Sequence, residues 1–309
     1  MTKASSSTAS GAVPFNGSEF SFSDADFKQI AQFLYAETGI ALTDAKKSLV
    51  YSRLVKRLRA LRLASFKDYR DYIDGPGGDA EKAQMIFSLT TNVTAFFRES
   101  HHFTQLMEEA LPPLIERAKM GGRVRIWSAG CSNGQEPYSI ALSLLTVCPD
   151  AEKYDIKILA TDIDGIVLEE ARHGLYSDRN VEGVPAGIKA KYLKRVGPDE
   201  WQVSDRVKAL VTFKQLNLIR PWPVKGPFDV IFCRNVVIYF DDPTKEKMWT
   251  QFAQHMAPDA YLFVGHSERV AGKSTRELAT AGVTAYRRRT AAVSSVGSDV
   301  ALGGATLPH

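Results

Sequence analysis

The segment VRIWSAGCSNGQEPYSIALSLL, residues 124–145, decides the fold, because it is typical of a strand, a glycine-containing loop and a helix in direct succession. Its first residues form a short apolar run, two glycines then allow tight turns, and helical apolar spacing follows. Backbone N–H groups at the start of such a helix favour polar or anionic ligand atoms. The loop holds neither a full G-x-G-x-x-G nor a P-loop, so on its own it is also compatible with an ordinary turn.

The composition is that of an ordinary globular protein. The chain has 309 residues, of which 44% are hydrophobic and 24% charged, and this length suggests a large domain with a smaller companion. We find no signal-peptide pattern and no run near the roughly 18 apolar residues of a membrane span, and therefore expect a cytoplasmic protein. Cys131, Cys148 and Cys233 are widely spaced and form no C-x-x-C pair, which argues against a disulfide framework or a zinc site.

The pattern along the chain predicts two domains between two tails. Residues 1–23 and 290–309 are rich in small and polar residues, so we expect a disordered N-terminal tail and a flexible C-terminal tail. Residues 24–90 read as an all-helical domain, with helices near 24–38, 44–63, 65–73 and 79–89. Residues 91–289 read as the main domain, with a small β-subdomain inserted at about 175–210, where Gly197 to Asp199 predict a hairpin turn.

The second predicted helix has one apolar face and one basic face. No acidic residue occurs between Ala45 and Phe66, so the cations lack i,i+4 carboxylate partners. Either this is a solvated face or it is a docking surface for an acidic partner. No aromatic side chains are interleaved along it for stacking on bases, which makes nucleic acid the weaker alternative. The cations of this basic face are Lys46, Arg53, Lys56, Arg57 and Arg59.

In the main domain, strands and helices alternate, which is typical of a doubly wound parallel sheet. Further strands are expected near 156–160, 211–213, 228–233, 260–264 and 284–287, and a helix near 241–257. Asp162 follows the second strand, where this architecture usually binds a ribose, whereas Asp164 is better placed to cap the next helix. Polar residues also follow the strands that end at 213 and 233, and these mark the binding edge of the sheet.

The segment 90–103 joins the two domains and carries polar side chains within an apolar stretch. Ser100 is expected to cap a helix that Pro112 and Pro113 interrupt. His101 and His102 are adjacent, so they should point in different directions on a helix, and we expect no metal site. His266, near the binding edge, is interpreted as a packing or hydrogen-bonding residue rather than a base.

Taken together, these motifs resemble the CheR family. The likeness covers about 24–287 and includes VYSRLVKRLRALRL, TTNVTAFFRESHHF, EPYSIA, ATDID, CRNVVIYFD and FVGHSE, in family order. The resemblance implies an α/β fold, with a Rossmann-like doubly wound methyltransferase sheet, an all-helical N-terminal domain and the inserted β-subdomain. It implies an S-adenosylmethionine-dependent protein-glutamate O-methyltransferase of bacterial chemotaxis receptors, which releases S-adenosylhomocysteine.

The resemblance also implies a set of cofactor-binding residues. Glu136 is assigned to the methionyl ammonium, Asp162 to the ribose, and Asn217 with Leu218 to the adenine, in keeping with what those groups can hydrogen-bond. The alternative role for Glu136 is to favour the start of the helix that it opens. The full implied set is Asn92, Thr94, Arg98, Glu136, Asp162, Asn217, Leu218, Asn235 and Val236.

Two departures from the family pattern are visible. Gln135 stands where the family more often has a second acid beside Glu136, and we expect cofactor binding to be retained but slightly altered. The hairpin segment 196–211 is a few residues shorter than in members that grip a peptide at the receptor's tail. We therefore predict an enzyme that does not depend on that tail.

Methyl transfer to a glutamate needs positioning rather than a general base, because a glutamate, with a pKa of about 4.3, is already an anion at neutral pH. Holding the carboxylate oxygen, the methyl carbon and the sulfur in line should supply most of the catalysis. Arg98 and Tyr239 are the candidates for orienting the carboxylate. The alternatives are an ion pair of Arg98 with Glu99 or another local acid, and a core-packing role for Tyr239.

The expected partner is the cytoplasmic helical domain of methyl-accepting chemotaxis receptors. We expect no nucleic acid, no membrane insertion and a monomer. Two other functions fit parts of the sequence, namely RNA methylation through the basic face and a non-catalytic sensor of an adenosine ligand. A nicotinamide dehydrogenase fits less well, because the complete glycine fingerprint is missing. If the basic face docks the receptor, Arg53→Glu with Arg57→Glu should weaken methylation without changing cofactor affinity.

Overall fold

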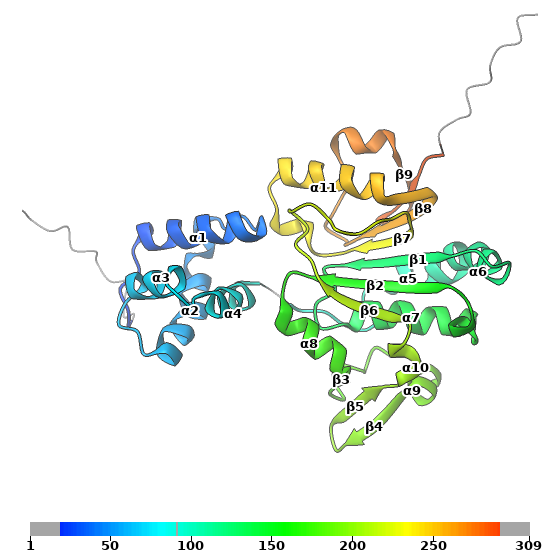
Figure 1. Ribbon diagram of the computed structural model, residues 1–309, viewed down its shortest axis with the longest axis horizontal. Coiled ribbons are helices and arrows are strands. Elements are labelled where there is room, and N and C mark those ends of the chain that lie inside the picture. The colour runs from blue at the N-terminus through cyan, green and yellow to red at the C-terminus, as the bar shows by residue number, and fades with distance from the viewer. Residues whose placement is uncertain (1–18, 91, 291–309) are drawn as a thin grey trace, which may run out of the picture.

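The computed structural model describes residues 19–90 and 92–290 (Figure 1). Most of both predicted tails therefore lies outside the described residues. The N-terminal boundary differs from the prediction, because Phe22 is buried against the rings of Phe27, Tyr51 and Phe66. Folded structure thus begins before Asp24. The apolar spacing that the sequence offered started at Phe27, and a single phenylalanine in a polar stretch gave no periodic signal.

The N-terminal helices form one small bundle, on the left in Figure 1. Their bounds are α1 Asp24–Thr38, α2 Lys47–Leu61, α3 Phe66–Asp74 and α4 Asp79–Leu89, with a 3-10 turn at Asp44–Lys46 before α2. Ser23 and Asp26 form a capping box that starts α1, and Gly39 ends it in the left-handed region at φ 76°. Ile30, Leu34 and Leu54 are fully buried in the shared core.

The main domain is built on a sheet that has seven strands within the described residues. In spatial order the strands are β6 (Val211–Gln215), β2 (Ile156–Asp162), β1 (Val124–Ala129), β7 (Phe228–Cys233), β8 (Met256–Val264), β10 (Ala285–Arg288) and β9 (Leu278–Gly282). The first five are parallel, and β10 runs antiparallel to β8 and β9. The predicted doubly wound fold is confirmed, although the edge strand β9 was not predicted.

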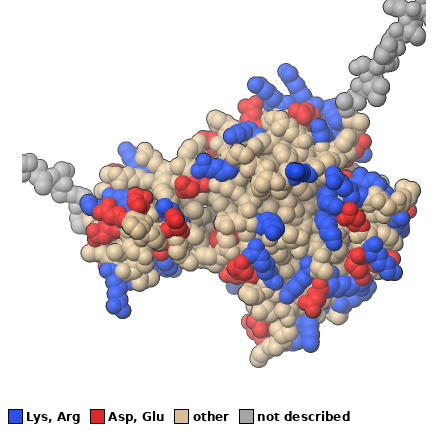
Figure 2. All heavy atoms as spheres, in the orientation of Figure 1, with Lys and Arg blue, Asp and Glu red and all other residues tan. Residues whose placement is uncertain are grey.

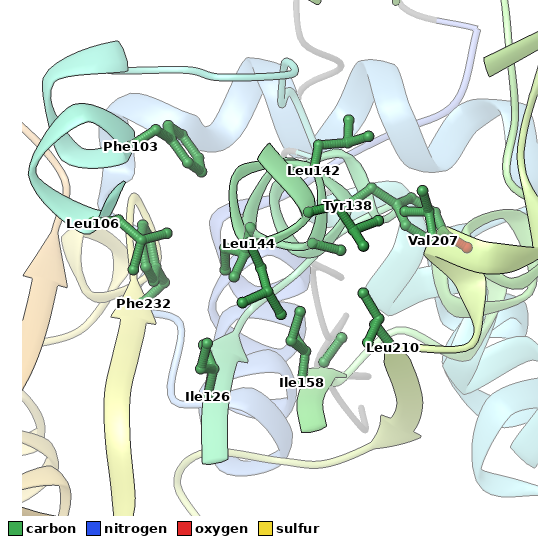
Figure 3. Close-up of a cluster of buried hydrophobic side chains, with 14 of the residues drawn as sticks. Phe103, Leu106, Ile126, Tyr138, Leu142, Leu144, Ile158, Val207, Leu210 and Phe232 are labelled. Carbon is green, nitrogen blue, oxygen red and sulfur yellow. The ribbon is translucent and has the colours of Figure 1, made fainter. Parts of the chain in front are cut away.

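Helices cover both faces of this sheet, as Figure 1 shows. One face packs against α6 (Leu111–Lys119), α7 (Gln135–Val147), α8 (Gly165–His173) and α10 (Asp205–Lys208), and the other against α11 (Asp242–His255). In Figure 3, Tyr138 and Leu144 of α7 lie over Ile126 of β1 and Ile158 of β2. Burial on both faces explains why β7 is apolar along nearly its whole length.

The inserted β-subdomain is confirmed as a three-stranded antiparallel sheet. Its strands are β3 (Leu175–Tyr176), β4 (Leu193–Gly197) and β5 (Glu200–Val203), in the order β3-β5-β4, and α9 (Ala186–Tyr192) precedes β4. The hairpin turn lies between Gly197 and Glu200, as predicted. Short 3-10 turns at Ala151–Lys153, Val237–Tyr239 and Gly272–Arg276 complete the described elements.

The helical region after residue 99 differs from the prediction in two ways. Glu99, not Ser100, precedes the first turn of α5 (Ser100–Gln105); it lies in the left-handed region at φ 56° and makes no side-chain cap. The prolines do not interrupt the run either. A π-helical turn, Leu106–Ala110, shifts the register so that Pro112 falls in the first turn of α6, where no backbone donor is needed.

The order of the strands locates the binding edge. From β1 the chain proceeds to β2 and β6 on one side, and then returns to β7 and β8 on the other side. The loops after β1 and β7 therefore diverge from neighbouring strand ends and leave a crevice between them. No helix within residues 19–90 and 92–290 is long and apolar enough to cross a membrane.

Candidate functional site

A cavity of about 480 Å³ opens at the carboxyl ends of the parallel strands. Its floor comes from the loops after β1, β2, β6 and β7. The segment 92–98 and the link between α1 and α2 form the rest of its wall. All residues proposed for the cofactor line this one cavity, and so does Tyr239. These are Asn92, Thr94, Arg98, Glu136, Asp162, Asn217, Leu218, Asn235 and Val236.

The loop after β1 depends on a glycine at its first position. Gly130 has φ 80°, and a Cβ atom placed there would lie 2.3 Å from Cγ2 of Val236 in the loop after β7. Only glycine allows the two loops to approach this closely. The backbone N–H groups of Gly130 and Cys131 donate to the carbonyl of Thr161, which ties this loop to the end of β2.

Glu136 lies in the first turn of α7 and faces the cavity. It makes no side-chain cap there, since the cap position is Gly134. Instead, its Oε1 accepts a 2.8 Å hydrogen bond from Ser128 Oγ, and its Oε2 lies 3.7 Å from Nε of Arg234. Burial raises the pKa of Glu136, with Arg234 opposing that rise. A buried carboxylate that keeps acceptor capacity toward the cavity is suited to an ammonium group.

Asp162 is the last residue of β2 and Asp164 follows the strand; Asp164 has the capping role that was predicted. The Oδ1 of Asp164 accepts from Ile166 N at 2.8 Å and so caps α8. Asp162 accepts backbone hydrogen bonds from Ser132 at 2.8 Å and Asp164 at 3.0 Å, while its side chain lines the cavity. Burial raises the pKa of Asp162 to about 6.

Asn92 and Asn217 connect neighbouring segments of the cavity wall through hydrogen bonds. The carbonyl of Asn92 accepts from Ser132 Oγ at 3.1 Å, and its side-chain amide lies 3.4 Å from Oδ2 of Asp164. The Nδ2 of Asn217 donates to the carbonyl of Glu37 at 2.7 Å, at the end of α1. Because Nδ2 of Asn217 already donates to Glu37, it cannot bind adenine at the same time. Adenine would have to bind other atoms of residues 217 and 218, or Asn217 would have to release Glu37.

Arg98 and Tyr239 line the same cavity from opposite chain segments. Arg98 does not pair with Glu99; its Nη1 donates to the carbonyl of Val93 at 3.0 Å. The side chain of Tyr239 is half-buried, and its hydroxyl makes no hydrogen bond to any residue in the described ranges. Its own carbonyl accepts from Ala41 N, which fixes the link between α1 and α2 above the site.

The structure adds Glu268, which sequence reasoning did not single out. Its buried carboxylate accepts hydrogen bonds from the consecutive N–H groups of residues 235–238 and from Gly265. This contact holds the loop after β7, including the left-handed Asn235 at φ 60°. Burial raises the pKa of Glu268, and the backbone donors oppose the rise. The FVGHSE motif was part of the family resemblance, but the sequence did not show which of its polar residues holds the loop after β7.

Arg234 is the second residue that the prediction missed. Its guanidinium is almost fully buried between Glu99 and Glu136, and its Nη2 donates to the carbonyl of Arg98. Burial alone would raise the pKa of Glu99, but Arg234 and His266 outweigh it and lower that pKa. Arg234 therefore lines the cavity itself and connects the segment 98–99 to Glu136.

The basic face of α2 is less free than the sequence suggested. Arg57 forms a bidentate pair with the buried Glu81, at 2.9 and 2.6 Å, and Arg59 pairs with Glu19. Arg53 donates to the carbonyls of residues 89 and 90. The expectation of uncompensated cations is thus wrong for these arginines, since their partners lie far away in the sequence. Lys56 is exposed, and Lys46 lies at the cavity.

The histidines also differ from the prediction. The rings of His101 and His102 do not diverge but lie 4.2 Å apart, and one ligand atom from each, with one from Glu99, falls within 4.8 Å of the others. Burial lowers the pKa of His102 to about 4. His266 is exposed, and its Nδ1 lies 3.3 Å from Glu99 Oε1, so it is a hydrogen-bonding residue as predicted.

Two family models together match almost all of the described residues. The family model described as "CheR methyltransferase, all-alpha domain" matches residues 25–90, and "CheR methyltransferase, SAM binding domain" matches residues 92–287. A probable chemotaxis protein methyltransferase of Rhizobium etli is 49% identical over 260 residues, covering 83% of this chain and 97% of the relative.

The chemotaxis protein methyltransferase of Escherichia coli is 42% identical over 250 residues, covering 80% of this chain and 85% of the relative. Among solved structures, an S-adenosylmethionine-dependent methyltransferase from Mesorhizobium loti matches with a TM-score of 0.26 and 16% identity. That match covers 51% of this chain and 54% of that chain, and it is too distant to support an argument.

Proposed function

The chain belongs to the CheR family of chemotaxis methyltransferases, and from this premise we propose that it methylates glutamate side chains of methyl-accepting chemotaxis receptors. The products would be glutamate methyl esters, which set the adaptation state of the receptor. The observation that carries the proposal is that Arg98 and Tyr239 both line the cavity that also contains the cofactor candidates. A guanidinium and a phenol are the groups that orient a carboxylate.

The cofactor of this enzyme is S-adenosylmethionine, which when bound supplies an electrophilic methyl group on a positively charged sulfur. The cavity fits its groups. Glu136 offers a buried carboxylate for the ammonium, and Asp162 offers one for ribose hydroxyls at the end of β2. Residues 217 and 218 would hold the adenine, through atoms other than the Asn217 Nδ2 that donates to the carbonyl of Glu37. Asn92, Thr94, Asn235 and Val236 complete the enclosure and exclude water.

The chain then has to position an acceptor, not to activate it. A glutamate acceptor is ionised at neutral pH, so Arg98 and Tyr239 need only hold one oxygen toward the methyl group while the other is bound. Arg98 is kept from collapsing onto an acid, because Glu99 faces Arg234, His102 and His266 instead. Arg98 has no carboxylate partner within residues 19–90 and 92–290, so its guanidinium remains available to a carboxylate from another protein.

We assign receptor docking to the basic face, with Lys56 as its exposed centre and Lys46 at the cavity. Figure 2 shows acidic and basic side chains interspersed over the N-terminal helices, so a broad single-sign field does not steer the acceptor on that side. Docking there would place an acidic receptor helix beside the cavity. We further propose a cytoplasmic, monomeric enzyme that acts on the cytoplasmic helical part of the receptor and does not need the receptor's tail peptide.

A competition assay tests this function. Enzyme, methyl-labelled S-adenosylmethionine, a purified receptor cytoplasmic fragment and total RNA are incubated together. We expect label on the receptor fragment, released by mild base as an ester is. Label only on RNA, or on neither acceptor, contradicts the proposal and favours RNA methylation or a non-catalytic sensor respectively.

A matched pair of variants tests the role of the phenol. Tyr239→Phe should lower kcat on the receptor at least tenfold with little change in cofactor affinity, since a single transition-state hydrogen bond is lost. Tyr72→Phe removes the same hydroxyl from an exposed tyrosine of α3 and should leave both quantities unchanged. Equal kcat values for the two variants would remove Tyr239 from the acceptor site.

A further inference from the structure

A cluster of metal-ligating side chains lies beside the cavity, at the start of α5. Glu99, His101 and His102 each bring one ligand atom within 4.8 Å of the other two. The left-handed conformation of Glu99, directly before the helix, makes this possible for residues so close in the sequence. His102 is fully buried, whereas His101 is exposed to solvent. The cluster therefore has both a fixed inner side and an open outer side.

The hydrogen bonds of His102 determine its tautomer. Its Nε2 lies 3.1 Å from the carbonyl oxygen of Val283 and 2.8 Å from Oγ1 of Thr284. A carbonyl can only accept, so Nε2 carries the ring proton and donates it. In the neutral ring, Nδ1 then presents a bare lone pair.

That lone pair faces another one. The Nδ1 of His102 lies 3.6 Å from Oε2 of Glu99, which is too long for a hydrogen bond. Both atoms are buried, and neither has a hydrogen-bond partner among the residues that the structure describes. Two unsatisfied acceptors that face each other inside a protein are costly unless a cation lies between them.

The distance of 3.6 Å between His102 Nδ1 and Glu99 Oε2 fits the separation of two ligand atoms that share a metal ion. With metal–ligand bonds of about 2.0–2.2 Å, a tetrahedral site separates its ligand atoms by roughly 3.3–3.6 Å. The bond from His102 Nε2 to the carbonyl of Val283 is the outer-shell contact that metal-binding histidines usually make. Imidazole and carboxylate together select borderline transition metals over Mg²⁺ and Ca²⁺.

We propose that Glu99, His101 and His102 form a binding site for a divalent transition metal ion of the zinc type. The fourth position belongs to water or to the exposed His266, whose Nδ1 lies 3.3 Å from the other oxygen of Glu99. Arg234 lies 3.8 Å from Oε2 of Glu99, so its positive charge opposes the ion. We therefore expect affinity weaker than that of a closed structural zinc site.

Cobalt and zinc titrations of the untagged, chelator-treated protein test this site without any methyl acceptor, so the result does not depend on the proposed function. Co²⁺ alone should give visible absorption bands that saturate at one equivalent, and Zn²⁺ should displace it. His101→Ala should weaken Co²⁺ binding at least tenfold. His101 is exposed, so this variant should fold normally. Glu99→Gln should weaken binding further, and His173→Ala, an exposed histidine of α8, should change nothing.

Two outcomes overturn the proposal. One is the absence of a saturable Co²⁺ spectrum, which would mean that a proton, as an imidazolium of His102 paired with Glu99, fills the gap. The other is equal Co²⁺ affinity in His101→Ala and His173→Ala, which would place the ion elsewhere. Saturable binding that is lost in His101→Ala and retained in His173→Ala supports it.

Discussion

The backbone N–H of Ser132 donates a 2.8 Å hydrogen bond to Oδ2 of Asp162, and this bond joins the loop after β1 to the end of β2. The same carboxylate faces the cavity, where we assign it to ribose hydroxyls. Burial raises its pKa to about 6, so its charge changes within the range in which the enzyme can be assayed.

Affinity for the cofactor product should therefore rise with pH. Hydroxyl donors bind the ionised form of Asp162, and a ligand that prefers this form lowers the pKa in the complex. Affinity for S-adenosylhomocysteine should fall by up to about tenfold per pH unit below pH 6 and level off above it. Calorimetric titrations between pH 5 and pH 8 measure this. Asp162→Asn should bind more weakly with a flatter profile, and an unchanged slope would assign the titration to another group.

Gly130→Ala should weaken cofactor binding. The added methyl meets Val236 at 2.3 Å, and the residue must also hold φ 80°, so the loops after β1 and β7 have to separate. Strain of this kind costs about 1–3 kcal/mol, which corresponds to roughly a five- to hundredfold loss of affinity. Gly187→Ala is the matched control, since a Cβ there meets nothing within 4 Å. Equal affinity in both variants would contradict the close approach of the two loops.

Glu268→Gln should loosen the loop after β7. In the parent protein, several backbone N–H groups donate to the two carboxylate oxygens of Glu268. In the variant, one oxygen becomes an amide nitrogen that cannot accept, so some of these N–H groups lose their acceptor. We expect a loss of about 1–3 kcal/mol in unfolding free energy and lower cofactor affinity, measured by denaturant titration and calorimetry. Glu182→Gln, at an exposed acid of the same domain, should change neither value. An unchanged unfolding free energy in Glu268→Gln would show that the loop after β7 keeps its conformation without this carboxylate.

Arg57→Ala should destabilise the N-terminal helices. It leaves Glu81 buried without its bidentate partner, while Tyr69 can still donate to that carboxylate. The expected loss is about 2–3 kcal/mol, which denaturant unfolding can resolve. Lys56→Ala, on the same helix but exposed, should stay within about 0.5 kcal/mol of the parent. Similar stabilities for the two variants would mean that the pair contributes nothing net.

Lys56→Glu tests docking without disturbing the fold. Arg53→Glu with Arg57→Glu should reduce receptor methylation as well, but that change also breaks the bonds to Glu81 and to the end of α4. For Lys56→Glu we expect KM for the receptor fragment to rise several-fold, more at low salt, with cofactor affinity unchanged. Lys273→Glu makes the same charge change outside the N-terminal helices and should leave KM unaltered. Equal KM values would remove the basic face from docking.

The alternation of the main domain was predictable, because buried parallel strands and their helices have strong local periodicity. Asp164 as a cap and the hairpin at Gly197 also followed from local chemistry. The edge strand β9 was missed since LATAG has little β-propensity, and its pairing with β10 is a tertiary contact. The π-helical turn at Leu106–Ala110 was also missed, because the prolines after it indicate a break in the helix and nothing in the sequence indicates a π-turn.

For the site, strand-end positions indicated the binding edge and the family resemblance implied which side chains share a cavity, but neither showed how each side chain is held. Arg57 and Glu81 lie 24 positions apart, and Asn235 and Glu268 lie 33 apart, so nothing local indicates either contact. The packing of His102 against Val283 is also long-range, and it decides which ring nitrogen is free. Periodicity specifies faces of elements, whereas partners across the fold require the fold itself.

The wall of the cavity belongs to both halves of the chain. The link between α1 and α2 contributes residues 40–43, and Asn217 reaches the end of α1 through the carbonyl of Glu37. A nucleotide that fills this cavity would contact both the N-terminal helices and the loops of the sheet, so its binding energy would favour the association of the two domains. Bound cofactor should therefore stabilise the contact between the two domains, which already share hydrogen bonds from Asn217 to the carbonyl of Glu37 and from Ala41 N to the carbonyl of Tyr239.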